Sequence, residues 1–419
     1  MCQLVRPVCA GGFVIGRAVA LPWRTPPALA GATRSTGATL MHTLPRTVFL
    51  LAVLGACSHD ATSPDGAIPR SAALARGGSD VGAVFTLSNS AAGNAVIAFA
   101  RGADGTLTPA GTFATQGNGT GAGLGSQGAV ALSGDGQFLF AVNAASNSIT
   151  SFAVDGTSLT HVSTVASGGT LPISLTTHGN LVYVLNAAGT ENITGFSVDQ
   201  NGRLAVLPGS SRPLSGTGVG PAEVGFDPSG TRLVVTEKNT NRIDVYAVGN
   251  DGYASAPVVN PAAGQTPFGF AFNQQGVLIV SEAFGGGVNA SAVSSYTLGS
   301  NGSLAVVSAS VPTTETSACW IAVTNNGKFA YAANTGSSSL TGYRVDHASL
   351  TILNADGKTG TTGTTAIDVA VSRNSQFLYT LTADAHSISA FSIRQNDGSL
   401  TSVNGVSGLP VGTVGLAAN

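Results

Sequence analysis

GAVALSGDGQFLFAVNAASNSITSF, residues 128–152, is the clearest copy of a unit that recurs along the chain. It begins with an apolar strand at Ala129–Leu132, which an Asp135-Gly136 turn joins to a second strand at Phe138–Val142. A short polar loop then leads to a third strand at the end of the stretch. Three consecutive antiparallel strands make up most of one blade of a propeller.

An aromatic residue near the end of the third strand marks each copy of the unit. These aromatics are Phe99, Phe152, Phe196, Tyr246, Tyr296, Tyr343 and Phe391. Successive members lie 44 to 53 residues apart, a period typical of propeller blades. Asp-Gly and Asn-Gly pairs recur at the later hairpin, and we interpret them as two-residue turns that need positive φ at both positions. The sequence therefore predicts an all-β fold, a seven-bladed β-propeller of four-stranded antiparallel blades.

The two ends of the repeat region complement each other. The first unit begins directly with its second strand, Ala83–Leu87, and so lacks an innermost strand. The last residues of the chain, Val411–Asn419, resemble a first strand with nothing after it. We expect this carboxyl-terminal strand to close the ring in the first blade, because an open ring would leave strand edges exposed.

The residues before the repeats include a segment with the pattern of a secretory signal. After Met41 come a short polar start with Arg46, an apolar core at Val48–Leu54, and small residues before Cys57. The residues upstream of Met41 show no sustained period of two or 3.6. The expected parts are an untranslated upstream region or long leader at 1–40, a signal peptide at 41–57, a flexible tether at 58–80 and the propeller at 81–419.

The end of the signal, Leu54-Gly55-Ala56-Cys57, resembles the lipobox of bacterial lipoproteins, in which the cysteine becomes the lipidated first residue. The apolar core is too short to span a bilayer, which needs about 20 residues. This resemblance implies an extracytoplasmic lipoprotein, anchored through Cys57 to a membrane at the periplasm or cell surface. The alternative is ordinary signal cleavage near Ala56, which would give a secreted protein.

The composition excludes some classes of partner. Charged residues make up 9% of the chain, against roughly 25% in typical domains, and the formal net charge is −2. Because the sequence has no basic run, we expect no binding to nucleic acid. Separately, we expect the protein to be a monomer. Cys319 is the only cysteine of the repeat region, and no His-rich spacing or calcium loop is present. We therefore expect neither a metal nor a cofactor.

Units such as GPAEVGFDPSGTRLVVTEKNTNRIDVY, residues 220–246, resemble the lactonase-type seven-bladed propellers with their YVTN-like repeats. That family includes the bacterial 6-phosphogluconolactonases and the fungal carboxymuconate-lactonizing enzymes. The resemblance covers about residues 81–419, including closure by the tail. It implies a site at the mouth of the central channel, on the side of the second-to-third-strand loops, in which His and Arg occur.

The chain departs from the family's His and Arg pattern in every blade that aligns. The histidine of the fourth blade falls on Ala222, the Arg-His pair of the fifth on Phe268 and Gly269, and the arginine of the seventh on Ile367. A carboxylate of the fifth blade falls at or beside Glu282. Lactone opening needs a base to activate water and a donor or cation to hold the oxyanion. The departures therefore favour binding without the family's catalytic set.

Polar residues at two equivalent positions of the units are the candidates for a replacement site. One position lies on the innermost strands, seven residues before the first hairpin, and the other lies at the end of the second strands. The candidate ligand-binding residues are Glu223, Glu237, Glu282, Trp320, Asn334 and Asp368. Unpaired carboxylates on innermost strands must face water or a partner. The alternatives are a water-filled channel without ligand and, for the asparagine, a local turn.

These residues lead to two hypotheses about function. The first is a lactonase-like propeller that binds a small molecule or a protein partner at the channel mouth. The alternative is an enzyme, either a lactonase (a carboxylic ester hydrolase) or a lactonizing isomerase, with Glu223, Glu282 or Asp368 as candidate catalytic base. We expect Glu223, Glu282, Trp320 and Asp368 to share the mouth. Because several carboxylates and no arginine lie there, we expect neutral or cationic ligands, with Trp320 as a stacking surface.

Overall fold

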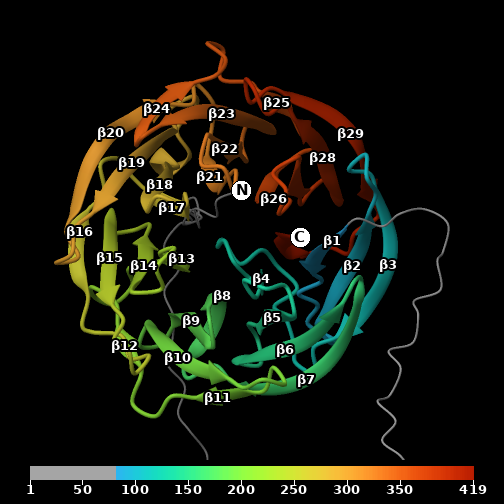
Figure 1. The fold of residues 1–419 in the computed structure, drawn as a ribbon, viewed down its shortest axis with the longest axis vertical. Coiled ribbons are helices and arrows are strands. Elements are labelled where there is room, and N and C mark those ends of the chain that lie inside the picture. Colours follow the sequence, from blue (N-terminus) through green and yellow to red (C-terminus); the bar gives the residue numbers. More distant parts are fainter. Residues whose placement is uncertain (1–81) are drawn as a thin grey trace, which may run out of the picture. The chain divides into compact units, whose positions relative to one another are not determined.

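A computed structural model describes residues 82–419 of the chain. Seven antiparallel sheets follow one another around a ring (Figure 1), and each sheet is one blade. The predicted all-β, seven-bladed propeller is confirmed. The predicted upstream region (1–40), signal (41–57) with Cys57, and tether (58–80) lie outside the described residues. No helix within residues 82–419 is long and apolar enough to cross a membrane.

Each blade has four strand positions, ordered from the channel outward. The innermost strands are β30 (Val414–Ala418), β4 (Val130–Leu132), β8 (Thr170–His178), β13 (Pro221–Phe226), β17 (Pro267–Phe272), β21 (Ala318–Val323) and β26 (Ala366–Val371). The second strands are β1 (Gly82–Leu87), β5 (Phe138–Asn143), β9 (Leu181–Ala188), β14 (Arg232–Glu237), β18 (Val277–Glu282), β22 (Phe329–Asn334) and β27 (Phe377–Thr382).

The third strands are β2 (Ala95–Arg101), β6 (Ser148–Asp155), β10 (Asn192–Val198), β15 (Arg242–Ala247), β19 (Ala292–Leu298), β23 (Ser339–Asp346) and β28 (Ser387–Ile393). The outer strands are β3 (Leu107–Ala114), β7 (Ser158–Ala166), β11 (Leu204–Val206), β16 (Val258–Pro261), β20 (Leu304–Pro312), β24 (Ser349–Ile352) and β29 (Leu400–Ser407). The short strands β12 (Arg212–Pro213) and β25 (Gly360–Thr361) extend the outer edges of two blades by pairing with β10 and β23. A 3-10 turn, η1 (Phe284–Gly286), follows β18.

The tail closes the ring as the incomplete first unit predicts. β1 pairs with β2 on one side and with β30 on the other, and Thr86 lies opposite Leu416. The Thr86 hydroxyl also donates a hydrogen bond to the Gly415 carbonyl at 2.6 Å. Both ends of the propeller therefore share one sheet, which leaves the first blade with no missing strand.

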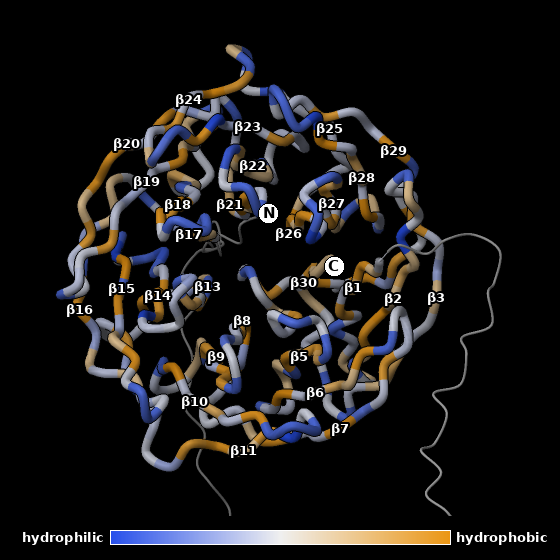
Figure 2. The backbone as a smooth tube through the Cα atoms, in the orientation of Figure 1, coloured by the Kyte–Doolittle hydropathy of each residue, from blue (hydrophilic) through white to orange (hydrophobic). Residues whose placement is uncertain are grey.

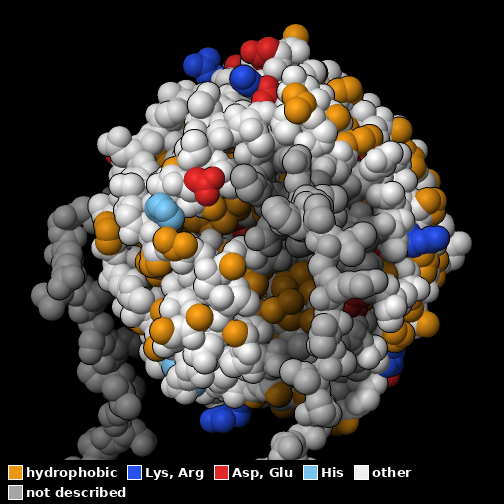
Figure 3. All heavy atoms as spheres, turned by 180° about the vertical axis from the view of Figure 1, so that it is seen from behind, with side chains coloured by type: hydrophobic (Ala, Val, Ile, Leu, Met, Phe, Trp, Pro, Cys, Tyr) orange, Lys and Arg blue, Asp and Glu red, His pale blue; other side chains and the backbone are white. Residues whose placement is uncertain are grey.

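The aromatic residues that mark the repeat lie between the blades. All seven fall on third strands, and each is at most 2% exposed. Burying such a side chain stabilises a fold by roughly 1.5–3 kcal/mol, so this one position links every blade to the core. Figure 2 shows hydrophobic stretches in each blade, interrupted by hydrophilic turns. On the face in Figure 3, the few charged side chains lie mostly toward the rim.

The later hairpins differ from the predicted two-residue turns with positive φ at both positions. At Asp104-Gly105 only the glycine has positive φ, 85°. The Asp104 carboxylate instead accepts the N–H of Thr106 at 3.0 Å. The side chains of Asp251, Asn301 and Asp397 accept the N–H two residues on in the same way. An Asp or Asn that bonds its own turn stabilises it without adopting the left-handed conformation.

Candidate functional site

The connection between β3 and β4 enters the centre of the ring (Figure 1), and its residues 123–128 are here called the plug. The plug contacts innermost strands of different blades. The backbone N–H of Gln127 donates to the Ala222 carbonyl on β13 at 3.1 Å. The Ser126 hydroxyl donates to the Ile173 carbonyl on β8 at 2.8 Å. These contacts hold the plug inside the channel.

The side chain of Gln127 attaches the plug to β21. Its Nε2 donates to the Ile321 carbonyl at 2.8 Å, and its Oε1 accepts the Ile321 N–H at 3.1 Å. The edge of an innermost strand has no further strand beside it, so the amide satisfies backbone groups that would otherwise need water. A Cβ at Gly269 would lie 2.1 Å from the Gln127 Oε1. Glycine at this position therefore makes room for the plug.

A cavity of about 530 Å³, here called the loop-face cavity, lies beside the plug among the second-to-third-strand loops. Lys238, in the loop after β14, lines it together with Phe268. The Lys238 Nζ donates to the Gly125 carbonyl at 2.6 Å and lies 4.7 Å from the centre of the Phe268 ring. Burial lowers the pKa of Lys238 to about 8, and the negative charge of Glu191 partly opposes this shift.

Trp320 lies on the other side of the plug, in a cavity of about 240 Å³ on the same face. Ile367 and Asp384 also line this cavity. The indole Nε1 donates to the Ser126 carbonyl of the plug at 2.9 Å, and the ring packs on Phe268 with centroids 5.0 Å apart. Trp320 is 3% exposed, so most of its surface packs against the plug and its neighbours.

Glu223 and Asp368 meet at a third cavity of about 280 Å³, here called the channel cavity. Its walls include Leu132, Thr177 and Phe226 at or near the far ends of innermost strands, so it lies beyond the plug from the loop face. Burial raises the pKa of Glu223 well above its usual value, and the negative charge of Asp368 raises it further. Burial also raises the pKa of Asp368 well above its usual value.

Glu237 and Glu282, at the ends of β14 and β18, turn away from these cavities. Glu282 accepts hydrogen bonds from the hydroxyls of Ser294 and Ser310 at 2.5 and 2.7 Å, and from the Gly264 N–H at 2.8 Å. Burial raises the pKa of Glu282 although these three donors oppose the shift. Glu237 accepts the N–H and the hydroxyl of Ser215 at 3.0 and 2.6 Å. Both carboxylates thus bind donors from their own blade or the connection before it.

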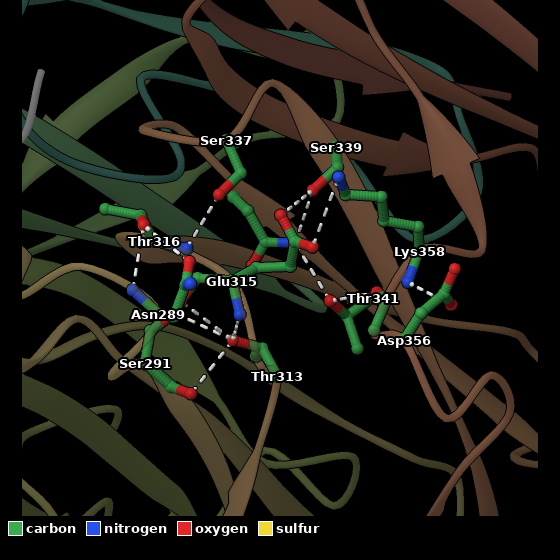
Figure 4. A network of polar contacts seen from close by, with 12 residues as sticks. Asn289, Ser291, Thr313, Glu315, Thr316, Ser337, Ser339, Thr341, Asp356 and Lys358 are labelled. Atoms are coloured by element: carbon green, nitrogen blue, oxygen red, sulfur yellow. Dashed lines mark hydrogen bonds and ion pairs between the residues drawn. The ribbon is translucent and has the colours of Figure 1, made fainter.

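Asn334 belongs to a polar network in the sixth blade. Its Nδ2 donates to the hydroxyls of Ser339 and Thr341 at 3.1 and 2.9 Å. Ser339 in turn donates to Glu315 at 3.0 Å, and the Lys358 Nζ lies 3.7 Å from the same carboxylate (Figure 4). The Asn334 side chain therefore joins the end of β22 to the start of β23.

The model of one protein family, the seven-bladed β-propeller lactonases, matches residues 92–212 and 218–414. The chain belongs to this lactonase family. No curated protein matches the chain. A solved structure from Lactobacillus plantarum has the same fold, with 18% sequence identity and a TM-score of 0.66 over 81% of this chain and 99% of that chain. A second, a proposed 6-phosphogluconolactonase from Bacteroides fragilis, has 20% identity and a TM-score of 0.60 over 81% of this chain and 98% of that chain. A third, the periplasmic gluconolactonase of Pseudomonas aeruginosa, has 18% identity and a TM-score of 0.60 over 79% of this chain and 98% of that chain.

In this lactonase-family chain, the positions where the resemblance implies His and Arg lie around the plug. Ala222 accepts a hydrogen bond from the plug through its carbonyl, and Gly269 gives space to Gln127. Phe268 packs between Trp320 and Lys238, and Ile367 lines a cavity whose other wall is the plug. The residues at these positions therefore take part in the contacts that position the plug or line the cavities beside it.

The structure brings together only some of the candidate residues. Glu223 and Asp368 share one cavity, whereas the plug separates them from Trp320, and Glu237, Glu282 and Asn334 bond within their own surroundings. Sequence reasoning missed Lys238. Because Glu237 precedes it, the sequence indicates a solvent-exposed ion pair between the two residues. A usable signal was present, because the chain has only three lysines and this one follows a second strand.

Proposed function

We propose that this chain is a lactonase-family propeller that binds a small molecule in the loop-face cavity, with a carbonyl or carboxylate oxygen of the ligand next to Lys238. The observation that carries the proposal is a buried cation in a cavity of ligand size. At about 530 Å³ the cavity falls within the roughly 300–1,000 Å³ of small-molecule sites. Its lining is mainly apolar with a few polar groups, as such sites usually are.

The ligand class follows from the groups that line this cavity. Lys238 supplies a cation, and Asn239 and Thr266 supply neutral polar groups. The described residues of the lining include no carboxylate. A neutral or singly negative ligand that carries oxygen atoms therefore fits this cavity. The sequence-based expectation of cationic ligands depended on carboxylates such as Glu223 and Asp368, which line the channel cavity instead. Because a gluconolactonase shares the fold, a lactone and its ring-opened acid are suitable first ligands.

Binding without turnover is favoured by the same geometry. Lys238 could hold a developing oxyanion, but a hydrolase also needs a base positioned to activate water. The described lining of the loop-face cavity includes no histidine, and the candidate bases Glu223 and Asp368 lie in the channel cavity. We therefore assign Lys238 a role in ligand binding.

Calorimetric titration of the detergent-solubilised full chain with D-glucono-1,5-lactone and with gluconate tests the proposal. A hydrogen bond to a charged group is worth about 1.5–3 kcal/mol, so Lys238→Met should weaken binding about ten- to a hundredfold. Lys328→Met, which removes a lysine outside the cavity, is the matched control and should bind as the wild type does. Gluconate binding should weaken above pH 8, because Lys238 then loses its proton.

Two results would overturn the proposal. Absence of saturable binding of both compounds to the wild type is one, and equal binding by the Lys238→Met and wild-type proteins is the other. Steady hydrolysis of the lactone that Glu223→Gln or Asp368→Asn abolishes would support instead a lactone hydrolase with a carboxylate base.

We also propose an extracytoplasmic location with a lipid anchor at Cys57, which rests on the pattern of residues 41–57. Intact-mass and amino-terminal peptide measurements on membrane-extracted protein should find a diacylated or triacylated amino terminus at Cys57. An unmodified terminus upstream of Met41 would contradict the proposal. Cleavage near Ala56 without lipid would indicate secretion.

A further inference from the structure

The channel cavity has features of a second binding site, separate from the loop-face cavity. The plug residues Gln127 and Gly128 form part of its wall, and Glu223 of the fourth blade and Asp368 of the seventh both line it. Two blades lie between these two in chain order, so their carboxyl groups reach the channel from different parts of the ring. Nothing in the proposed binding at Lys238 uses them.

The two carboxyl groups retain hydrogen-bonding capacity toward the cavity. The Glu223 Oε2 accepts the Phe270 N–H at 2.6 Å, and the Asp368 Oδ1 accepts the Val369 N–H at 2.7 Å. The Asp368 Oδ2 is buried and accepts no hydrogen bond of normal geometry from the described residues, although the nearby Leu416 N–H also lowers the pKa of this carboxyl. A buried acceptor without a donor is costly, so Oδ2 is a position that a ligand donor would satisfy.

No positive charge of the protein compensates these carboxyls within the cavity. Among its lining residues that the structure describes, none is Lys, Arg or His. The plug side of the wall contributes only the neutral Gln127, whose amide is already bonded to Ile321. A positively charged ligand would therefore supply both the missing donors and the missing charge.

The walls decide between a metal ion and an organic cation. Calcium takes six to eight oxygen ligands, and magnesium keeps several waters around it. No group of three or more His, Cys, Asp or Glu side chains in residues 82–419 is arranged to hold a metal. Apart from the two carboxyls, most of the side chains that line the cavity are apolar, including Leu175, Val224 and Phe270, while Thr176 and Thr177 add hydroxyl groups. Such walls favour an alkyl chain that ends in an ammonium group.

We propose that the channel cavity binds a small organic amine, with its ammonium group bonded to Asp368 and Glu223 and its apolar body against the neighbouring strands. A water molecule occupies about 30 Å³ of liquid, so a cavity of about 280 Å³ has room for roughly nine groups of that size. A five-carbon monoamine or diamine fits within this limit. The raised pKa of each carboxyl is consistent with a cavity that lacks its cation.

A matched set of five-carbon compounds tests the proposal on the full chain, by calorimetry at pH 8. Pentylamine and 1,5-diaminopentane should bind, 1-pentanol should bind at least tenfold more weakly than pentylamine, and pentanoate should not displace the amine. Glu223→Gln and Asp368→Asn should each weaken pentylamine binding at least tenfold. Lys328→Met, which changes a lysine outside both cavities, should leave it unchanged, and gluconate should not compete with pentylamine, which separates this site from the loop-face cavity.

The comparison of ligands on wild-type protein keeps the test valid even if a substitution impairs folding. Equal binding of pentanol and pentylamine would overturn the proposal, as would absence of amine binding. Amine binding that survives both carboxyl substitutions in folded protein would also overturn it. Stronger stabilisation against heat by magnesium or calcium chloride than by either amine would assign the cavity to a hydrated metal ion instead.

Discussion

Replacing Gln127 by alanine should loosen the plug, since this side chain makes the two-point contact with β21. The substitution removes the hydrogen bonds between the Gln127 amide and the N–H and carbonyl of Ile321. The other plug contacts stay, including those from Trp320 and Lys238 to the plug carbonyls. The change should therefore detach one side of the plug without unfolding the propeller.

The expected cost follows from the two bonds that are lost. A net contribution of about 0.5–1.5 kcal/mol for each gives roughly 1–3 kcal/mol in total. Water that reaches the channel edge of β21 would reduce the loss toward the lower value. Gln127→Met, which keeps the length of the side chain but cannot form either bond, should lose a similar amount. Gln200→Ala, at an exposed hairpin position, is the matched control and should change little.

Urea unfolding measures the free-energy change, and tryptophan quenching reports on the plug itself. The chain has two tryptophans, and Trp23 lies upstream of the proposed mature terminus at Cys57, so the mature protein should carry Trp320 as its one tryptophan. In the mature protein Gln127→Ala should make Trp320 fluorescence more sensitive to acrylamide, because the indole packs beneath the plug. The reasoning is refuted if the urea midpoint matches that of Gln200→Ala and the quenching of Trp320 is unchanged.

Two further predictions concern stability. Burial and the negative charge of Glu237 raise the pKa of Asp244 to about 8, so the native state keeps a proton that the unfolded chain releases. Stability should therefore fall as the pH rises from about 4 to about 8, by at most about 6 kcal/mol. Urea midpoints at pH 5 and pH 9 should differ less in Asp244→Asn, and an equal difference would contradict this assignment. Deleting Val414–Asn419 removes the strand that pairs with β1 and should markedly lower the melting temperature, whereas an unchanged melting temperature would show that the ring does not depend on closure by the tail.

The sequence by itself determined the number of blades and the closure of the ring. Every marker aromatic lies buried on a third strand, and the tail pairs with the strand that lacked an inner neighbour. Both results follow from the local sequence pattern. Strands that are consecutive in the sequence pair within a blade, and each repeat buries its aromatic residue at the same position, so the pattern can be seen in the sequence alone. The hairpins were located correctly, but their turn type depends on side-chain bonds such as the one from Thr106 to Asp104.

The candidate site could be predicted only in part. Register placed Glu223 and Asp368 at the channel because both occupy the same position on innermost strands. Register does not decide where a side chain at a strand end points. Glu282 bonds to Ser294 and Ser310 on the neighbouring third and outer strands, and those donors direct it away from the channel.

Only the tertiary structure decided the path of the plug, the separation of the cavities and the buried position of Lys238. The plug lies in a connection outside the repeated unit, so periodicity gives no information about its path. Its anchor joins Gln127 to Ile321, a residue 194 positions further along the chain. Contacts between residues so far apart depend on the closed ring, which brings distant innermost strands around one axis and leaves their edges free to bond whatever enters the channel.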